Sequence, residues 1–100
     1  MIHELKCWPE YYQEVIKKRK SFELRKNDRP FACGDILRLR EWCPCSKEYQ
    51  GPEGFFTIEY ILRSTEDFPI PGLELGYCIM SIRPARRREV SKARNGDKNK

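Results

Sequence analysis

The residues best suited to chemistry lie together in one short segment of the chain. They are an amine, a hydroxyl, a carboxylate and a guanidinium, at Lys20, Ser21, Glu23 and Arg25. Ammonium and guanidinium groups bind phosphate and carbonyl oxygens, and a carboxylate accepts hydrogen bonds from amino groups. The set therefore suits a phosphate or a polar base. If the protein is an enzyme, Lys20 with Glu23 as general base is the expected catalytic pair.

A strand is the element that would position these side chains. Phe22 and Leu24 alternate with the three polar residues that follow Lys20, and successive side chains of a strand point to opposite faces. The pattern predicts that Phe22 and Leu24 are buried and that the polar face is displayed. On that face, Glu23 and Arg25 are expected to form an ion pair that orients the guanidinium.

Positive charge is concentrated in two parts of the chain. Residues 17–29 hold seven Lys or Arg and two acids, and residues 83–100 hold eight and two, whereas the whole chain of 100 residues has a net charge of +5. The folded part is therefore expected to be polarised, and we assign residues 1–84 to one domain. Residues 85–100 are predicted to be a disordered basic tail. The tail either adds non-specific affinity for nucleic acid or only solubilises the chain.

The cysteines indicate the reducing cytoplasm as the compartment. Their number is five, which is odd, and the N-terminus carries no signal-peptide pattern. Cys43 and Cys45 are separated by one residue, whereas zinc sites repeat ligand pairs at wider spacing, so we expect no metal and no other cofactor. Cys7, Cys33 and Cys78 are predicted to be core residues, with the Cys43/Cys45 pair in a turn. No stretch is long enough to cross a membrane.

Hydrophobic periodicity predicts one early helix and five main strands. The helix is expected over residues 9–19, beginning at Pro9 and ending either in a slightly strained exit or through a left-handed Arg19. The strands are expected at residues 2–8, 21–25, 36–42, 55–63 and 76–82. Short strands with bent connections predict an α+β domain built as a small closed or half-open β-barrel of about five or six strands with one N-terminal helix.

The alternation within two strands predicts which side chains face the core. In the first strand these are His3, Leu5 and Cys7. In the strand over residues 55–63, one face is expected to carry Phe56, Ile58, Tyr60 and Leu62 and the other Thr57 and Glu59.

Aromatic side chains provide candidates for stacking on a base. Trp8 and Tyr77 are expected in the core, as aromatic residues of a small barrel usually are. Trp42 ends a strand beside a loop, so it remains a candidate binding residue. His3, the one histidine, is expected to be hydrogen-bonded in a structural role.

The ordered set of motifs resembles the ASCH superfamily, in particular its small single-domain branch of unknown function in phages and bacteria. The resemblance spans residues 2–82. It is carried by His3-Glu4-Leu5-Lys6, Lys20-Ser21-Phe22-Glu23-Leu24-Arg25-Lys26-Asn27-Asp28-Arg29, Phe31, Gly34-Asp35-Ile36-Leu37, Glu41-Trp42, Gly76-Tyr77 and Ile79-Met80-Ser81-Ile82.

The resemblance implies a PUA-like β-barrel and a cleft lined by Lys20, Glu23 and Arg25, for which RNA or nucleotide binding has been proposed. Some relatives resemble amidohydrolases acting on N-acetylcytidine, and others resemble ribonucleases. The amidohydrolase branch has a threonine, held to be catalytic, where this chain has Glu23. That departure argues against carrying the activity over.

Three functions remain open from the sequence. The first is a monomeric module that binds RNA or a nucleotide through Lys20, Ser21, Glu23, Arg25 and Trp42, with no membrane partner. The second is a small hydrolase acting on a modified nucleoside or on RNA. The third is a phage adaptor that binds a protein.

Overall fold

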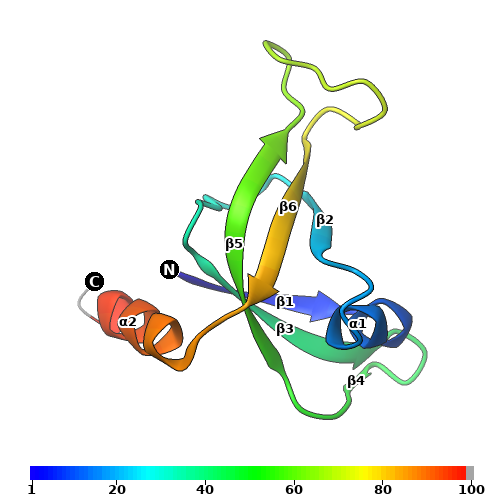
Figure 1. Cartoon of the computed structure of the whole chain (residues 1–100). Coiled ribbons are helices and arrows are strands. Elements are labelled where there is room, and N and C mark those ends of the chain that lie inside the picture. Colours follow the sequence, from blue (N-terminus) through cyan, green and yellow to red (C-terminus); the bar gives the residue numbers. More distant parts are fainter. Residues whose placement is uncertain (99–100) are drawn as a thin grey trace.

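Two helices and six strands make up the computed structural model of this protein, which describes residues 1–98 (Figure 1). In chain order they are β1 (Ile2–Cys7), α1 (Pro9–Ile16), β2 (Phe22–Lys26), β3 (Ile36–Cys43), β4 (Glu48–Tyr49), β5 (Gly54–Arg63), β6 (Tyr77–Pro84) and α2 (Arg87–Lys98). The predicted α+β class, the early helix and the number of strands are confirmed. None of the helices in residues 1–98 is long and apolar enough to span a membrane.

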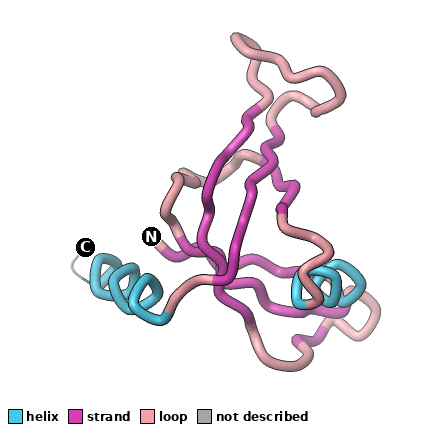
Figure 2. The backbone as a smooth tube through the Cα atoms, viewed as in Figure 1, coloured by secondary structure: helices cyan, strands magenta, loops and turns pink. Residues whose placement is uncertain are grey.

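All six strands belong to one bent sheet in the order β1-β3-β5-β6-β2, with β4 paired to β3. β1 runs parallel to β3, and the other neighbours are antiparallel. β3 pairs with residues 54–57 of β5 and β6 with residues 56–63, and β5 and β6 run steeply across β1 and β3 (Figures 1 and 2). Within the described residues no backbone ladder joins β1 to β2. The sheet is therefore not closed as a barrel, and β1 and β2 are its two edges.

The core lies on the inner face of the bent sheet and under α1. β1 buries His3, Leu5 and Cys7, as its alternation predicted. The other apolar residues of this core are Tyr12, Val15, Phe31, Leu37, Leu39, Phe56, Ile58, Ile61, Cys78, Met80 and Ile82. His3 is held there by Asp35, whose Oδ2 lies 2.8 Å from Nε2, so the expected hydrogen bond of this side chain is confirmed.

Helix α1 begins at Pro9 as expected but ends earlier, at Ile16. The left-handed residue after it is Lys18, with a φ of 62°, so the assignment of this conformation to Arg19 was wrong. Arg19 instead pairs with Glu14, with Nε 2.5 Å from Oε2. The turn at Lys18 reverses the chain and brings Lys20 back beside β1.

A bulge in β5 overturns the predicted facing of its second half. The register with β6 shifts between Ile58 and Tyr60. Beyond this shift Tyr60 is 63% exposed and Ile61 is buried, although Tyr60 had been placed on the core face. Thr57 is also buried. A bulge inserts one residue into the period-two pattern, which sequence alternation alone does not reveal.

The C-terminal segment forms helix α2, so the prediction of disorder from residue 85 was wrong for the described part; residues 99–100 lie outside it. Arg83 donates two hydrogen bonds to the carboxylate of Glu89, at 2.9 and 2.7 Å. The same carboxylate accepts the backbone N–H of Arg86 at 2.8 Å, as a capping residue does. The guanidinium of Arg94 lies 5.3 Å from the centre of the Phe55 ring. These contacts dock a helix that carries few apolar residues.

The cysteines are all free thiols. Cys7 and Cys78 are buried as predicted, whereas Cys33 is exposed, contrary to the expectation that it lies in the core. Cys33 belongs to the turn before β3, where Ala32 donates its N–H to Asp35. The Cys43/Cys45 pair lies where β3 turns into β4, as expected.

Candidate functional site

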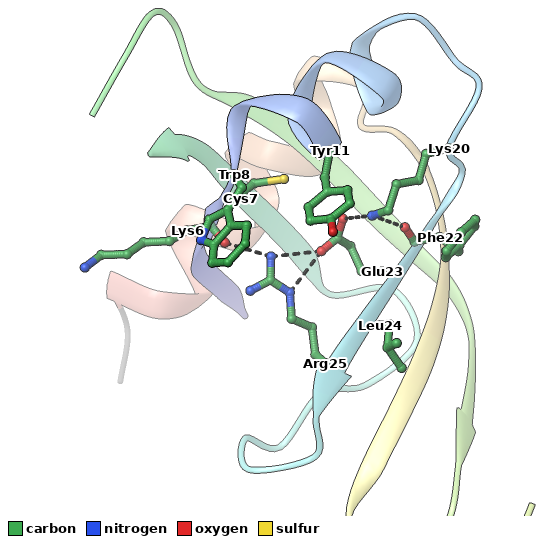
Figure 3. Close-up of a pocket in the computed structure, with 9 residues that line it drawn as sticks. All are labelled: Lys6, Cys7, Trp8, Tyr11, Lys20, Phe22, Glu23, Leu24 and Arg25. Atoms are coloured by element: carbon green, nitrogen blue, oxygen red, sulfur yellow. Dashed lines mark hydrogen bonds and ion pairs between the residues drawn. The ribbon is translucent and has the colours of Figure 1, made fainter. Parts of the chain in front are cut away.

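A pocket of about 610 Å³ lies between the two edge strands, and we call this gap between β1 and β2 the seam. Its lining comes from β1, β2, the start of α1 and the segment between α1 and β2 (Figure 3). The residues are Lys6, Cys7, Trp8, Tyr11, Lys20, Phe22, Glu23, Leu24 and Arg25. The structure thus brings Lys20, Glu23 and Arg25 together in one pocket.

The centre of the pocket is the carboxylate of Glu23, a residue that is only 2% exposed. Lys20 Nζ lies 2.6 Å from Oε1, and Arg25 Nε and Nη2 each lie 2.9 Å from Oε2. Figure 3 shows the carboxylate between the two cations. The predicted ion pair of Glu23 with Arg25 is therefore confirmed, and Lys20 adds a second cation. Burying one charge among two of opposite sign offsets part of its desolvation cost.

The two faces of β2 are reversed relative to the prediction. Phe22 is 46% and Leu24 53% exposed, whereas Glu23 is buried. The physical reason is that β2 lies at an edge of the sheet. One of its faces points into the seam, where Glu23 pairs with Lys20 and Arg25. Ser21 is exposed and does not line the pocket. Its carbonyl accepts the N–H of Ile82 at 3.0 Å, which is a backbone role.

Besides Phe22, two exposed aromatic rings line the pocket, and sequence reasoning missed both. Trp8 is 47% and Tyr11 51% exposed. Their ring centres are 6.3 Å apart and their planes meet at 18°, so they are stacked. Trp8 had been assigned to the core, and Tyr11 had not been considered. Their spacing of three residues around the helix start, which places two side chains on one helix face, was the available signal.

Trp42 lies outside the pocket. It is on β3, opposite Tyr49 of β4, and Lys6 Nζ lies 4.4 Å from the centre of its ring. In Figure 3 the Lys6 side chain points away from the other lining residues. Trp42 was predicted to bind the same ligand as Glu23, which requires both residues to lie in one pocket. The structure does not bring them together.

Cys7 is the one thiol among the lining residues. Burial, with a further contribution from the Glu23 carboxylate, raises its pKa to about 11. At neutral pH the group is a thiol, and the thiolate is the nucleophilic form. Cys7 therefore forms part of the pocket wall, and its raised pKa disfavours the thiolate at neutral pH.

A second concave surface runs along α2. Helix α2 itself lies at the opposite end of β1 and β3 from α1 (Figure 1). The concave surface is lined by Arg86, Arg87, Arg88, Ser91, Lys92 and Asn95. Its side chains are basic or neutral, so it attracts anions. Among the residues that the structure describes, no group of three or more His, Cys, Asp or Glu side chains is arranged to hold a metal ion.

Comparison with known proteins gives two similarities. Over 41 residues the chain is 44% identical to the "Uncharacterized 12.9 kDa protein in GpA 3'region" of Escherichia phage P2. That alignment covers 41% of this chain and 38% of the phage protein, well under two thirds of either. Residues 2–82 match the family described as "Domain of unknown function (DUF3850)". Since this match covers well over half of the chain, including both edge strands and the seam, the chain belongs to the DUF3850 family.

Proposed function

We propose that the seam pocket binds a nucleotide, either free or as one unit of a single-stranded RNA. One observation supports this most strongly. The buried carboxylate of Glu23, with Lys20 and Arg25 on either side, lies next to the exposed rings of Trp8 and Tyr11. A nucleotide combines a polar base edge, an aromatic face and a phosphate, and this pocket offers a partner for each.

The charged cluster supports a binding role because it is a costly way to fill a protein interior. Replacing a buried ion pair with apolar side chains of similar volume is often neutral or stabilising by about 1 to 4 kcal/mol. The side chain of Lys20 is 17% and that of Arg25 25% exposed, so both can also reach a ligand. Packing alone does not require the charged groups of Lys20, Glu23 and Arg25. A binding role accounts for their presence.

The aromatic border supports a base more than an isolated anion. Stacking of a base on an aromatic side chain contributes about 1 to 3 kcal/mol and tolerates any sequence. Trp8 and Tyr11 are exposed without a ligand, and their apolar faces gain from being covered. Two cations against one carboxylate leave a net positive charge that attracts a phosphate.

The basic surface of α2 supports RNA as the larger ligand. Arg86, Arg87 and Arg88 lie beside Lys92 on a helix fixed to the domain through the Arg83–Glu89 pair. Phosphate contacts of this kind position a strand without reading its sequence. In this proposal the pocket holds one nucleotide and α2 contacts the backbone some distance away.

We also propose that the domain is a PUA-like barrel of the ASCH superfamily in which the last backbone ladder is missing. The strand order leaves β1 and β2 as edges, and the side chain of Arg25 reaches the carbonyl of Lys6 across the seam. A barrel opened at one seam keeps its curvature and acquires a pocket there.

Calorimetric titration of the full chain with nucleoside monophosphates and short single-stranded RNAs tests the proposal. We expect saturable binding, with NMR shifts at Trp8, Tyr11 and residues 20–25. Chromatography of the same samples reports any hydrolysis product. Replacing Arg87 and Arg88 with Gln should reduce the salt dependence of RNA binding but leave mononucleotide binding unchanged. If no nucleotide or RNA binds at millimolar concentration, the pocket has another role.

A further inference from the structure

We propose that the base recognised in the seam pocket is guanine, an inference that rests on the nucleotide-binding function proposed above. It comes from the order of polar atoms around Glu23. Each carboxylate oxygen is held by a different cation, Oε1 by Lys20 and Oε2 by Arg25. The lining therefore presents a donor, two acceptors and a donor in a row.

The carboxylate retains the capacity to accept from a ligand. An ionised carboxylate has about four acceptor positions on its two oxygens. Lys20 Nζ donates to Oε1 at 2.6 Å and Arg25 Nε donates to Oε2 at 2.9 Å, whereas Arg25 Nη2 donates to the carbonyl of Lys6. Since each carboxylate oxygen accepts one of these hydrogen bonds, each keeps capacity for a further donor.

Guanine carries the complementary order along one edge. Its O6 accepts, its N1–H and 2-amino group donate, and its N3 accepts. In this arrangement Lys20 donates to O6, the two oxygens of Glu23 accept from N1–H and the amino group, and Arg25 donates to N3. The two parallel N–H groups match the two oxygens of one carboxylate, as the paired donors of arginine do.

The other bases do not fit this order. Cytosine and adenine each place an acceptor nitrogen next to their amino group, and that nitrogen would face a carboxylate oxygen. Uracil has a single N–H between two carbonyls, so one carbonyl would face Glu23. Two acceptors in contact leave both without a donor, which is costly in a buried site.

The size and the apolar lining of the pocket suit a purine base. The volume of about 610 Å³ lies within the range of small-molecule sites, about 300 to 1,000 Å³. Trp8 and Tyr11 present nearly parallel ring faces at its border, and Phe22 and Leu24 add apolar surface. A purine has the larger π face for such contacts.

Titration of the full chain with GMP, IMP, AMP, CMP and UMP tests the inference without any mutation. IMP differs from GMP only in lacking the 2-amino group, and we expect it to bind about 10-fold more weakly. 1-Methyl-GMP lacks the N1–H and should lose at least as much. AMP, CMP and UMP should bind about 10- to 100-fold more weakly than GMP.

The outcomes separate the two proposals. If none of the five nucleotides and no short single-stranded RNA binds, the proposed function itself fails. If nucleotides bind but IMP equals GMP, or a pyrimidine binds best, the guanine inference is overturned and nucleotide binding stands. Glu23→Gln replaces one acceptor with a donor and should abolish the preference for GMP over IMP, provided that its thermal unfolding remains cooperative. If Glu23→Gln does not fold, the affinities of the unmodified chain for GMP and IMP still decide whether guanine is recognised.

Discussion

The guanidinium of Arg25 joins two strands that share no backbone hydrogen bond. Its Nη2 donates to the carbonyl of Lys6, 2.8 Å away on the free edge of β1. Two residues earlier on the same edge, the carbonyl of Glu4 accepts from Arg29 Nη1 at 2.9 Å. Arginine side chains thus satisfy carbonyls that a neighbouring strand would otherwise pair with. They bridge the seam while leaving room for a pocket.

Removing Arg25 should therefore destabilise the protein. In Arg25→Ala the Lys6 carbonyl loses its donor and Glu23 keeps only Lys20, so we expect a loss of about 2 to 3 kcal/mol in the free energy of unfolding. Urea denaturation measures it. Arg38→Ala is a matched control, since Arg38 is 37% exposed in its ion pairs with Glu4 and Glu53 and should cost less than about 1 kcal/mol. Equal losses in the two variants would show that Arg25 does not hold the seam.

The carboxylate of Glu23 should prove more important to stability than either of its cations alone. Glu23→Gln leaves Lys20 and Arg25 adjacent without a counter-charge, and we expect a loss of about 3 kcal/mol. Combining it with Lys20→Met removes one of the two uncompensated cations and should recover part of that loss. A double-mutant cycle in urea measures the coupling between the two sites. A coupling energy near zero would contradict the geometry of the pair.

Sequence reasoning grouped Lys20, Glu23 and Arg25, which the structure brings together, but it also included Ser21 and inverted the faces of the strand. It grouped Glu23 with Arg25 because they share one face, and the ion pair is present. It predicted that Phe22 and Leu24 are buried because apolar side chains usually are buried. That rule fails where a strand lies at a sheet edge beside a polar pocket, since the cations that compensate Glu23 come partly from a preceding turn. The position of β2 at the edge depends on the whole sheet order, which no local pattern shows.

Residues far apart in the chain account for the other differences. Trp8 and Tyr11 reach the pocket because β1 is the opposite edge strand, so their role depends on a tertiary relationship. Helix α2 is ordered by Arg83 of β6 binding Glu89, a pair that appears in the sequence only as two more charges. The charge content of this segment predicted disorder because composition does not show which charged side chains form ion pairs.

The pairing of Glu89 makes the docking of α2 sensitive to acid. Hydrogen bonds from Arg83 and from the backbone N–H of Arg86 lower the Glu89 pKa from 4.5 to about 2. Since the folded pKa is depressed, this contribution to stability is fully present above about pH 4.5 and is lost as the pH falls toward 2. NMR titration of the Glu89 carboxyl should show a midpoint near 2. In Arg83→Gln the midpoint should move up toward 4.5, and a midpoint that stays unchanged would show that Arg83 is not its partner.

The thiols should differ in their rates of alkylation. Hydrogen bonds from the backbone and side chain of Ser46, with others from Cys45, lower the pKa of Cys43. Burial raises the pKa of Cys7 and of Cys78. At pH 7.5 iodoacetamide should therefore label Cys43 well before the two buried thiols, as followed by peptide mass spectrometry.

A single substitution controls for the cause of the fast reaction. Ser46→Ala removes the hydroxyl donor and should slow labelling of Cys43. Labelling of Cys33, which is exposed on a separate turn, should not change. If both rates fall together, a general change in the protein and not the hydrogen bond is responsible.

The two tryptophans of the chain offer a direct test of which surface meets the ligand. Trp8 borders the pocket, whereas Trp42 contacts Lys6 on another face of the sheet. Trp8→Ala should weaken GMP binding about 10-fold, equivalent to about 1.4 kcal/mol of stacking. Because Trp8 is 47% exposed, stability should change by less than about 1 kcal/mol. Trp42→Ala should leave the affinity unchanged.

Fluorescence separates the same two residues without relying on lost affinity. In Trp42→Phe the remaining indole is Trp8, and a base stacked on it should quench its emission as GMP is added. In Trp8→Phe the remaining indole is Trp42, which should report no change while calorimetry still detects binding, since phenylalanine preserves an aromatic face. Quenching of Trp42 instead would place the ligand on the outer face of β3.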